Sequence, residues 1–154
     1  MRERVLVGVV ALTLSCLSPA AAFAEGGTGK AGFLAQATWS AFECAVLANI
    51  AGDADEHSRL IDYGYDKGQK FMSELRGGKV KKEDFADEVP DPFISLLKGP
   101  SNDFILGRIY QSAEEEILSG EVVISEDDEM NLDEERTDAA QKKFKALNCP
   151  LIGH

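Results

Sequence analysis

Residues 31–52 have the sequence AGFLAQATWSAFECAVLANIAG, in which Glu43 is the only charged side chain. At about 100° per residue, one helical face of this stretch is apolar. It carries Ala35, Trp39, Phe42, Val46, Leu47 and Ile50. The opposite face carries the small side chains Ala37, Ala41, Ala45 and Ala48. A helix that is apolar on both faces normally lies at the centre of its domain. We therefore predict a central helix over about 29–51, ended by Gly52.

Capping residues, glycines and prolines divide the remaining chain into further helices. An acidic N-cap predicts a second helix over about 53–76. Asp91 and Pro92 begin a brief helix, and two longer helices are predicted over 101–119 and about 133–147. No alternating apolar pattern and no Asn-Gly or Asp-Gly turn indicates a β-hairpin. The sequence thus predicts an all-α fold, a compact bundle of about four to five helices.

The inner faces of these helices follow from their apolar spacing. The stripe of the fourth helix consists of Leu106, Ile109, Tyr110, Ala113 and Ile117. The last helix is expected to turn Ala140, Phe144 and Leu147 inward.

Gly64 and Gly68 share the apolar arc of the second helix, which predicts a close approach to the alanine face of the central helix, or alternatively a kink there. Residues 79–89 are charged and weakly patterned, and we expect a loop with one short turn.

Residues 1–24 have the three-part form of a secretory signal peptide. Arg2 and Arg4 precede a long uncharged run, and the small residues Ala22 and Ala24 stand at −3 and −1 of the expected cut. Cleavage there leaves 25–154 as a single helical domain of 130 residues. We expect a periplasmic or secreted protein with no stable membrane anchor after cleavage.

Two other interpretations of this start are open. Residues 5–24 are uncharged and long enough to span a bilayer as an uncleaved anchor, although Pro19 interrupts them. Cys16 suggests a lipid-modified cysteine, but no branched apolar residue stands three positions before it.

Removal of the signal peptide leaves two cysteines, Cys44 and Cys149. In an oxidising compartment an isolated pair most simply forms one disulfide, which here closes a loop of about 100 residues. The alternative is two buried free thiols. No Asn-x-Ser/Thr sequon occurs, which favours a bacterial envelope over a eukaryotic secretory route.

The chain is acidic, with 27 Asp and Glu against 16 Lys and Arg. Its net charge of −11 becomes −12 on cleavage, because residues 1–24 carry one more positive than negative charge. Such a surface repels nucleic acid and anionic membranes and suits a cationic partner. The acidic loop, about 121–135, holds eight carboxylates and no base. Without a calcium-loop pattern, we expect a solvated segment that binds calcium only weakly, and no metal site.

Glu43 is the candidate catalytic residue, because a carboxyl group on an apolar face has a raised pKa and can act as a general acid. A structural role is the favoured interpretation. In that case its side chain forms an ion pair or a hydrogen bond with one of Arg59, Arg108, Tyr63, Tyr65 and Tyr110.

His57 lies on the inner arc of the second helix and is expected to be structural. Only His154 is left to join it, and no zinc-ligand spacing occurs.

The outer face of the fourth helix is the candidate binding surface. It carries Phe104, Arg108, Gln111 and Glu115 at i, i+4, i+7 and i+11. An arginine beside an exposed aromatic side chain resembles a protein-binding hot spot in type. The alternative is that residues 79–89 cover Phe104, which is then a second core contact.

The chain has no nucleophile elbow, phosphate-binding loop, paired catalytic carboxylates or haem-attachment motif. We therefore expect no cofactor, and more readily a non-enzymatic protein than an enzyme. The leading hypothesis is an exported protein of the bacterial envelope that binds another protein, as an inhibitor or immunity-type protein. The alternative is a small envelope hydrolase that acts on a glycan with Glu43 as its buried general acid.

Overall fold

A computed structural model describes residues 27–120 and 132–154, and within them it contains helices and no strand. The α-helices are α1 (Gly27–Ile50), α2 (Ala54–Arg76), α3 (Asp91–Ser95), α4 (Asn102–Ser119) and α5 (Leu132–Ala146). Three 3₁₀ helices are η1 (Lys82–Asp84), η2 (Ala86–Glu88) and η3 (Cys149–Leu151). The predicted all-α bundle is confirmed. The predicted signal peptide and residues 121–131 of the predicted acidic loop lie outside the described residues.

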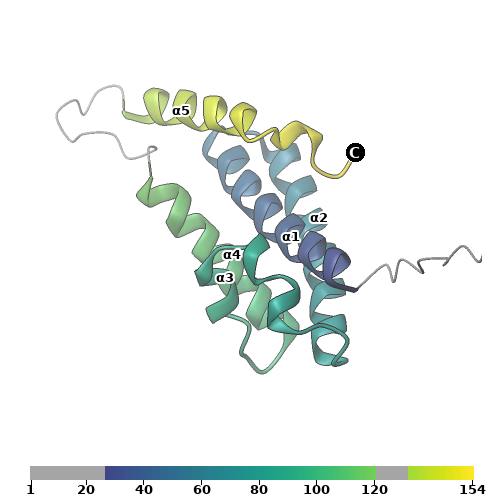
Figure 1. The fold of residues 1–154 in the computed structure, drawn as a ribbon. Coiled ribbons are helices and arrows are strands. Elements are labelled where there is room, and N and C mark those ends of the chain that lie inside the picture. Colours follow the sequence, from purple (N-terminus) through teal and green to yellow (C-terminus); the bar gives the residue numbers. More distant parts are fainter. Residues whose placement is uncertain (1–26, 121–131) are drawn as a thin grey trace, which may run out of the picture.

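The helix α1 is the centre of the bundle and packs against α2, α4 and α5 (Figure 1). Both of its faces are covered: the predicted apolar face is buried except for the half-buried Ile50, and so are Ala41, Ala45 and Ala48 of the alanine face. No helix in the described ranges 27–120 and 132–154 is long and apolar enough to cross a membrane.

Two glycines of α2 allow it to lie close to its neighbours. A Cβ atom on Gly64 would lie 2.8 Å from the Phe42 ring and 3.1 Å from Ala41 Cβ. A Cβ atom on Gly68 would lie 2.5 Å from Leu106 Cδ2. The predicted close approach to the alanine face is thus confirmed for Gly64, while Gly68 makes room for a side chain of α4. The helix α2 continues through this point without interruption, from Ala54 to Arg76.

Gly64→Ala is expected to lower the free energy of unfolding by about 1–2 kcal/mol, because overpacking outweighs the gain of about 1 kcal/mol in helix propensity. Gly107→Ala is the matched control: a Cβ atom there meets nothing within 4 Å. That variant should gain about 1 kcal/mol. Urea unfolding of both variants measures the difference, and equal gains for the two would contradict a close helix contact at Gly64.

The segment between α2 and α4 belongs to the core, which the sequence interpretation missed. The predicted loop at 79–89 contains η1 and η2, and it buries Val80 and Phe85. The ring of Phe71 makes edge-to-face contacts with the rings of Phe85 and, from α3, Phe93. The ring centroids are 4.9 Å apart for Phe71 and Phe85 and 5.6 Å apart for Phe71 and Phe93. The many charged residues of this segment face outward, and among them the spacing of Val80 and Phe85 gives no recognisable apolar pattern in the sequence.

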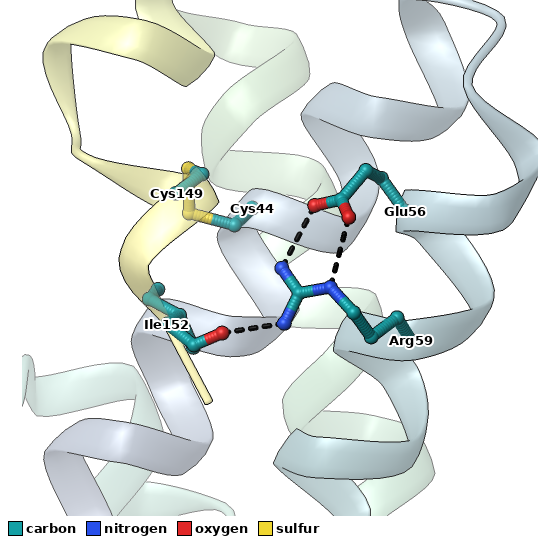
Figure 2. Close-up of a disulfide and its surroundings, with 5 residues drawn as sticks. All are labelled: Cys44, Glu56, Arg59, Cys149 and Ile152. Carbon is teal, nitrogen blue, oxygen red and sulfur yellow. Dashed lines mark hydrogen bonds and ion pairs between the residues drawn. A yellow bond between two sulfur atoms is a disulfide. The ribbon is translucent and has the colours of Figure 1, made fainter. Parts of the chain in front are cut away.

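The predicted disulfide is confirmed: Cys44 of α1 is bonded to Cys149, with a Cα–Cα distance of 5.6 Å and both side chains buried. Figure 2 shows how the chain beyond it is held on α2. The guanidinium group of Arg59 donates two hydrogen bonds to the Glu56 carboxylate and one to the carbonyl oxygen of Ile152. The disulfide and the hydrogen bonds of the Arg59 guanidinium group thus fix residues 149–152 against the bundle.

The last helix differs from prediction at its end. Ala140 is buried and Phe144 is half-buried, as expected, but Leu147 is 44% exposed. The helix ends at Ala146, and Asn148 then adopts a left-handed conformation with φ of 55°. The chain therefore turns back toward Cys44 before Leu147 reaches the core.

Candidate functional site

The N-terminal half of α4 presents an aromatic side chain stacked with an arginine. The helix start is fixed by Ser101, whose Oγ accepts a hydrogen bond from the backbone N–H of Phe104 at 3.1 Å. The guanidinium carbon of Arg108 lies 5.6 Å from the centre of the Phe104 ring. Arg108 Nη1 also donates to the carbonyl oxygen of Lys98 at 3.3 Å. Both side chains are thereby held in place on the surface.

Phe104 is 49% exposed, so the alternative that it is a second core contact is wrong. Its partial cover includes Gly99, where an added Cβ atom would lie 2.7 Å from Phe104 Cδ1. A ring that is half in water yet packed on its rear face is held in a defined orientation.

The other two predicted binding residues lie beside this pair. Gln111 Nε2 donates to Glu115 Oε1 at 3.1 Å. A hollow of about 210 Å³ opens here, lined by Leu96, Arg108, Gln111, Ser112 and Glu115. The structure thus brings the four residues predicted from helical spacing onto one face, which we call the α4 face (Phe104, Arg108, Gln111 and Glu115).

Glu43 is half-buried in α1, and its pKa is raised from 4.5 to about 7. Burial is the largest cause, because it penalises the charged form. The carboxylate of Glu116, from α4, raises the pKa further. A hydrogen bond from the Trp39 side chain and the charge of Lys143, from α5, act in the opposite direction.

Three of the five predicted partners of Glu43 are engaged elsewhere. Arg59 binds Glu56 and the tail, and Arg108 stacks on Phe104. Tyr65 donates its hydroxyl hydrogen to Asp103 at 2.6 Å. These three predicted pairings are wrong because Arg59, Arg108 and Tyr65 each bind another group. Trp39 precedes Glu43 by one helical turn, whereas only the packing of α4 and α5 on α1 brings Glu116 and Lys143 near Glu43.

His57 has the structural role that was expected. Its Nδ1 lies 2.9 Å from the carbonyl oxygen of Ala45, to which it donates a hydrogen bond. The contact ties the start of α2 to α1.

The sequence interpretation missed a groove between α1, α2 and the C-terminal residues. Phe33 and Leu151 are 56% and 72% exposed and lie on this groove. Its volume is about 540 Å³, and Tyr63, Lys67 and Ile152 also line it. Leu151 and Ile152 stand two and three residues after Cys149, and this was the available signal for an apolar tail beside the disulfide.

Comparisons of the chain with protein-family models, with curated proteins and with solved structures found no match. Function is therefore inferred from the residues of this chain alone.

Proposed function

We propose that this is an exported protein of the bacterial envelope that acts by binding another protein, as an inhibitor or immunity-type protein. The observation that carries the proposal is the pair formed by the exposed Phe104 and the partly exposed Arg108, which neighbouring groups hold in place. Export is supported by the form of residues 1–24 and by the Cys44–Cys149 disulfide, which suits an oxidising compartment.

The α4 face has the chemistry of a binding hot spot. Tryptophan, tyrosine and arginine dominate binding energy at interfaces, and an aromatic anchor beside an arginine combines apolar area with directed hydrogen bonds. Side chains already fixed by a stacking contact and a carbonyl oxygen lose little further freedom when a partner binds. The adjacent hollow of about 210 Å³ suits one inserted side chain of that partner.

The partner we propose is a cationic protein. The net charge, −11 for the whole sequence and −12 after the proposed cleavage, accelerates the encounter with a basic surface and slows that with an acidic one. On α4 itself, Glu114, Glu115 and Glu116 are consecutive. A basic side chain of the partner would meet Glu115 at the hollow, and an apolar side chain elsewhere on the same partner surface would pack on Phe104, about 16 Å away along α4.

The double variant Phe104→Ala, Arg108→Ala is expected to weaken partner binding at least 100-fold, because two hot-spot side chains each contribute about 2 kcal/mol or more. Its melting temperature should stay within about 2 °C of the parent, because surface substitutions change stability little. The partner is first captured from envelope extract with the parent protein, and its affinity is then measured by titration calorimetry.

The matched control is Asp66→Ala, Lys70→Ala, which removes another exposed pair four residues apart, on α2. It should bind the partner as the parent does. Unchanged binding by the α4-face variant would remove that face from the proposal. A loss of many degrees in its melting temperature would instead make Phe104 a structural residue.

The alternative, a glycan hydrolase, has one observation in its favour. The pKa of Glu43, about 7, is that of a carboxyl group that can hold a proton near neutral pH. A general acid also has to reach its substrate, and Glu43 lines neither the groove at Phe33 nor the hollow at Arg108. Protein binding is therefore the function that the geometry supports better.

A further inference from the structure

The groove beside the C-terminal residues has a volume of about 540 Å³, within the range of about 300–1,000 Å³ that small-molecule sites occupy. We call it the tail groove. One face of α1, one turn of α2 and the C-terminal residues form it, and its lining is Phe33, Gln36, Ala37, Ser40, Tyr63, Lys67 and residues 151–154. Its size suits a small molecule.

The walls of the tail groove are fixed before any ligand binds. The disulfide holds the chain that leads into it, and Arg59 of α2 donates a hydrogen bond to the carbonyl oxygen of Ile152 (Figure 2). Gly153 then lies against the ring of Tyr63: its φ is 83°, and a Cβ atom there would lie 2.8 Å from Tyr63 Cδ2. A ligand that enters such a preformed site loses less free energy to ordering of the protein.

Two apolar side chains on the tail groove are open to water. Leu151 is 72% exposed and Phe33 is 56% exposed, the largest fractions among the large apolar side chains of the described residues. They come from opposite ends of the described chain, yet they line one groove. Covering both removes apolar surface from water, which is favourable in proportion to the area covered. The groove therefore favours a ligand with an apolar body.

The side-chain charges on the tail groove are the reverse of those of the whole chain. Among the described residues that line it, Lys67 and His154 are basic and none is acidic, whereas the chain has 27 acidic and 16 basic residues. The Lys67 ammonium group lies 4.7 Å from the centre of the Tyr63 ring and 3.6 Å from Asp66 Oδ2, which is beyond hydrogen-bond distance. Asp66 accepts a hydrogen bond from Lys70 instead, at 2.7 Å. Lys67 is therefore the group of the groove that can bind an anion.

We propose that the tail groove binds a fatty acid of medium chain length. The carboxylate accepts a charge-assisted hydrogen bond from the ammonium group of Lys67, and the hydrocarbon chain packs against Phe33 and Leu151. A carboxylate is favoured over a cationic head group because Lys67 repels positive charge. A hydrocarbon chain is favoured over a polar ligand because it covers the two exposed apolar side chains.

Two other occupants fit the groove less well. A second copy of the chain, in a symmetric contact, would bring Lys67 toward Lys67 and join two chains of net charge −11. A different protein needs about 800 Å² on each partner for a stable interface. Two apolar side chains and one lysine supply only part of that area.

Titration of the purified protein with sodium decanoate, below its micelle concentration and followed by backbone amide NMR, tests the site. We expect saturable shifts with one-site behaviour at residues 33–40, 63–67 and 151–153, and constant positions for residues 104–115. Decanol and decyltrimethylammonium carry the same chain with a neutral and a positive head group. Decanol should bind about tenfold more weakly than decanoate, because it lacks the charge-assisted bond, and the cation more weakly still.

Variants separate the contribution of the head group from that of the chain. Lys67→Gln should weaken decanoate binding about tenfold and leave decanol binding unchanged. Lys70→Gln is the matched control, because it removes an exposed lysine of the same helix that does not line the groove, and it should change neither affinity. Leu151→Ser should weaken both ligands by the same factor, since both carry the chain. Melting temperatures within about 2 °C of the parent check that each variant is folded.

Each outcome decides the matter. Decanol that binds as tightly as decanoate, or a Lys67→Gln variant that binds decanoate as the parent does, would overturn the proposal. A dimer at sedimentation equilibrium that Leu151→Ser dissociates would assign the groove to a second copy and overturn it as well. The proposal is independent of the α4 face: the variant Phe104→Ala, Arg108→Ala should bind decanoate as the parent does, so either function can fail without the other.

Discussion

Replacing Cys44 and Cys149 together by alanine is expected to lower the free energy of unfolding by about 4–5 kcal/mol. The bond joins residues 105 apart in the sequence, so its loss frees a long loop in the unfolded chain. Because most domains are stable by only about 5–15 kcal/mol, this loss is a large part of the total. The last turns of α5 and residues 149–152 should also lose hydrogen-exchange protection, since only the non-covalent contacts of Arg59 and Ile152 then hold this part of the tail among the described residues.

Urea unfolding at neutral pH measures the effect in three samples: the oxidised parent, the reduced parent and the double alanine variant. The reduced parent keeps both buried sulfur atoms and loses only the cross-link. Equal losses in the reduced parent and the variant would assign the stability to the cross-link. If the reduced parent is as stable as the oxidised one, the prediction is contradicted. Any loss of stability in the alanine variant would then come from the lost packing of the two sulfur atoms.

Phe71→Ala is expected to cost about 3–5 kcal/mol, the range for truncating a fully buried aromatic side chain. Phe71 has no exposed surface, and edge-to-face contacts join it to Phe85 and Phe93. Its removal leaves a cavity where α2, α3 and the segment with η1 and η2 meet. Those two 3₁₀ helices should therefore lose protection before α1 does.

The matched control is Phe33→Ala, a change of the same chemistry at a ring that is 56% exposed. It should alter the free energy of unfolding by no more than about 0.5 kcal/mol. Urea unfolding of the two variants, with exchange measured on residues 82–88, checks both expectations. Similar losses for the two would show that the aromatic cluster contributes no more than a surface ring.

Helical spacing and capping chemistry predicted much of this fold. The two apolar faces of residues 31–52 indicated a central helix, and α1 has that position. Asp53 as N-cap marked the start of α2, where its side chain accepts the hydrogen bond from Glu56 N–H at 3.1 Å. The spacing of Phe104, Arg108, Gln111 and Glu115 placed them on one face, where the structure has them. In each case the information is local, carried by residues within a few turns.

Predictions that depended on distant contacts were less successful. Phe85 lies in a charged segment, and its burial depends on Phe71 in another helix. Leu147 was expected to face inward, but the turn at Asn148 leaves it exposed. Arg59 was a proposed partner of Glu43, yet Glu56 stands three residues away on the same helix and holds it. Periodicity does not say which helix a side chain meets.

The sequence by itself determined the helices, the central place of residues 31–52 and the single cysteine pair of the domain, because each follows from patterns along the chain. The tertiary structure decided the environment of Glu43. One carboxyl group in an apolar stretch is an isolated feature until α4 brings Glu116 and α5 brings Lys143 beside it. Burial and charge act through space, and their effect on a proton depends on neighbours that lie 73 and 100 positions away in the sequence.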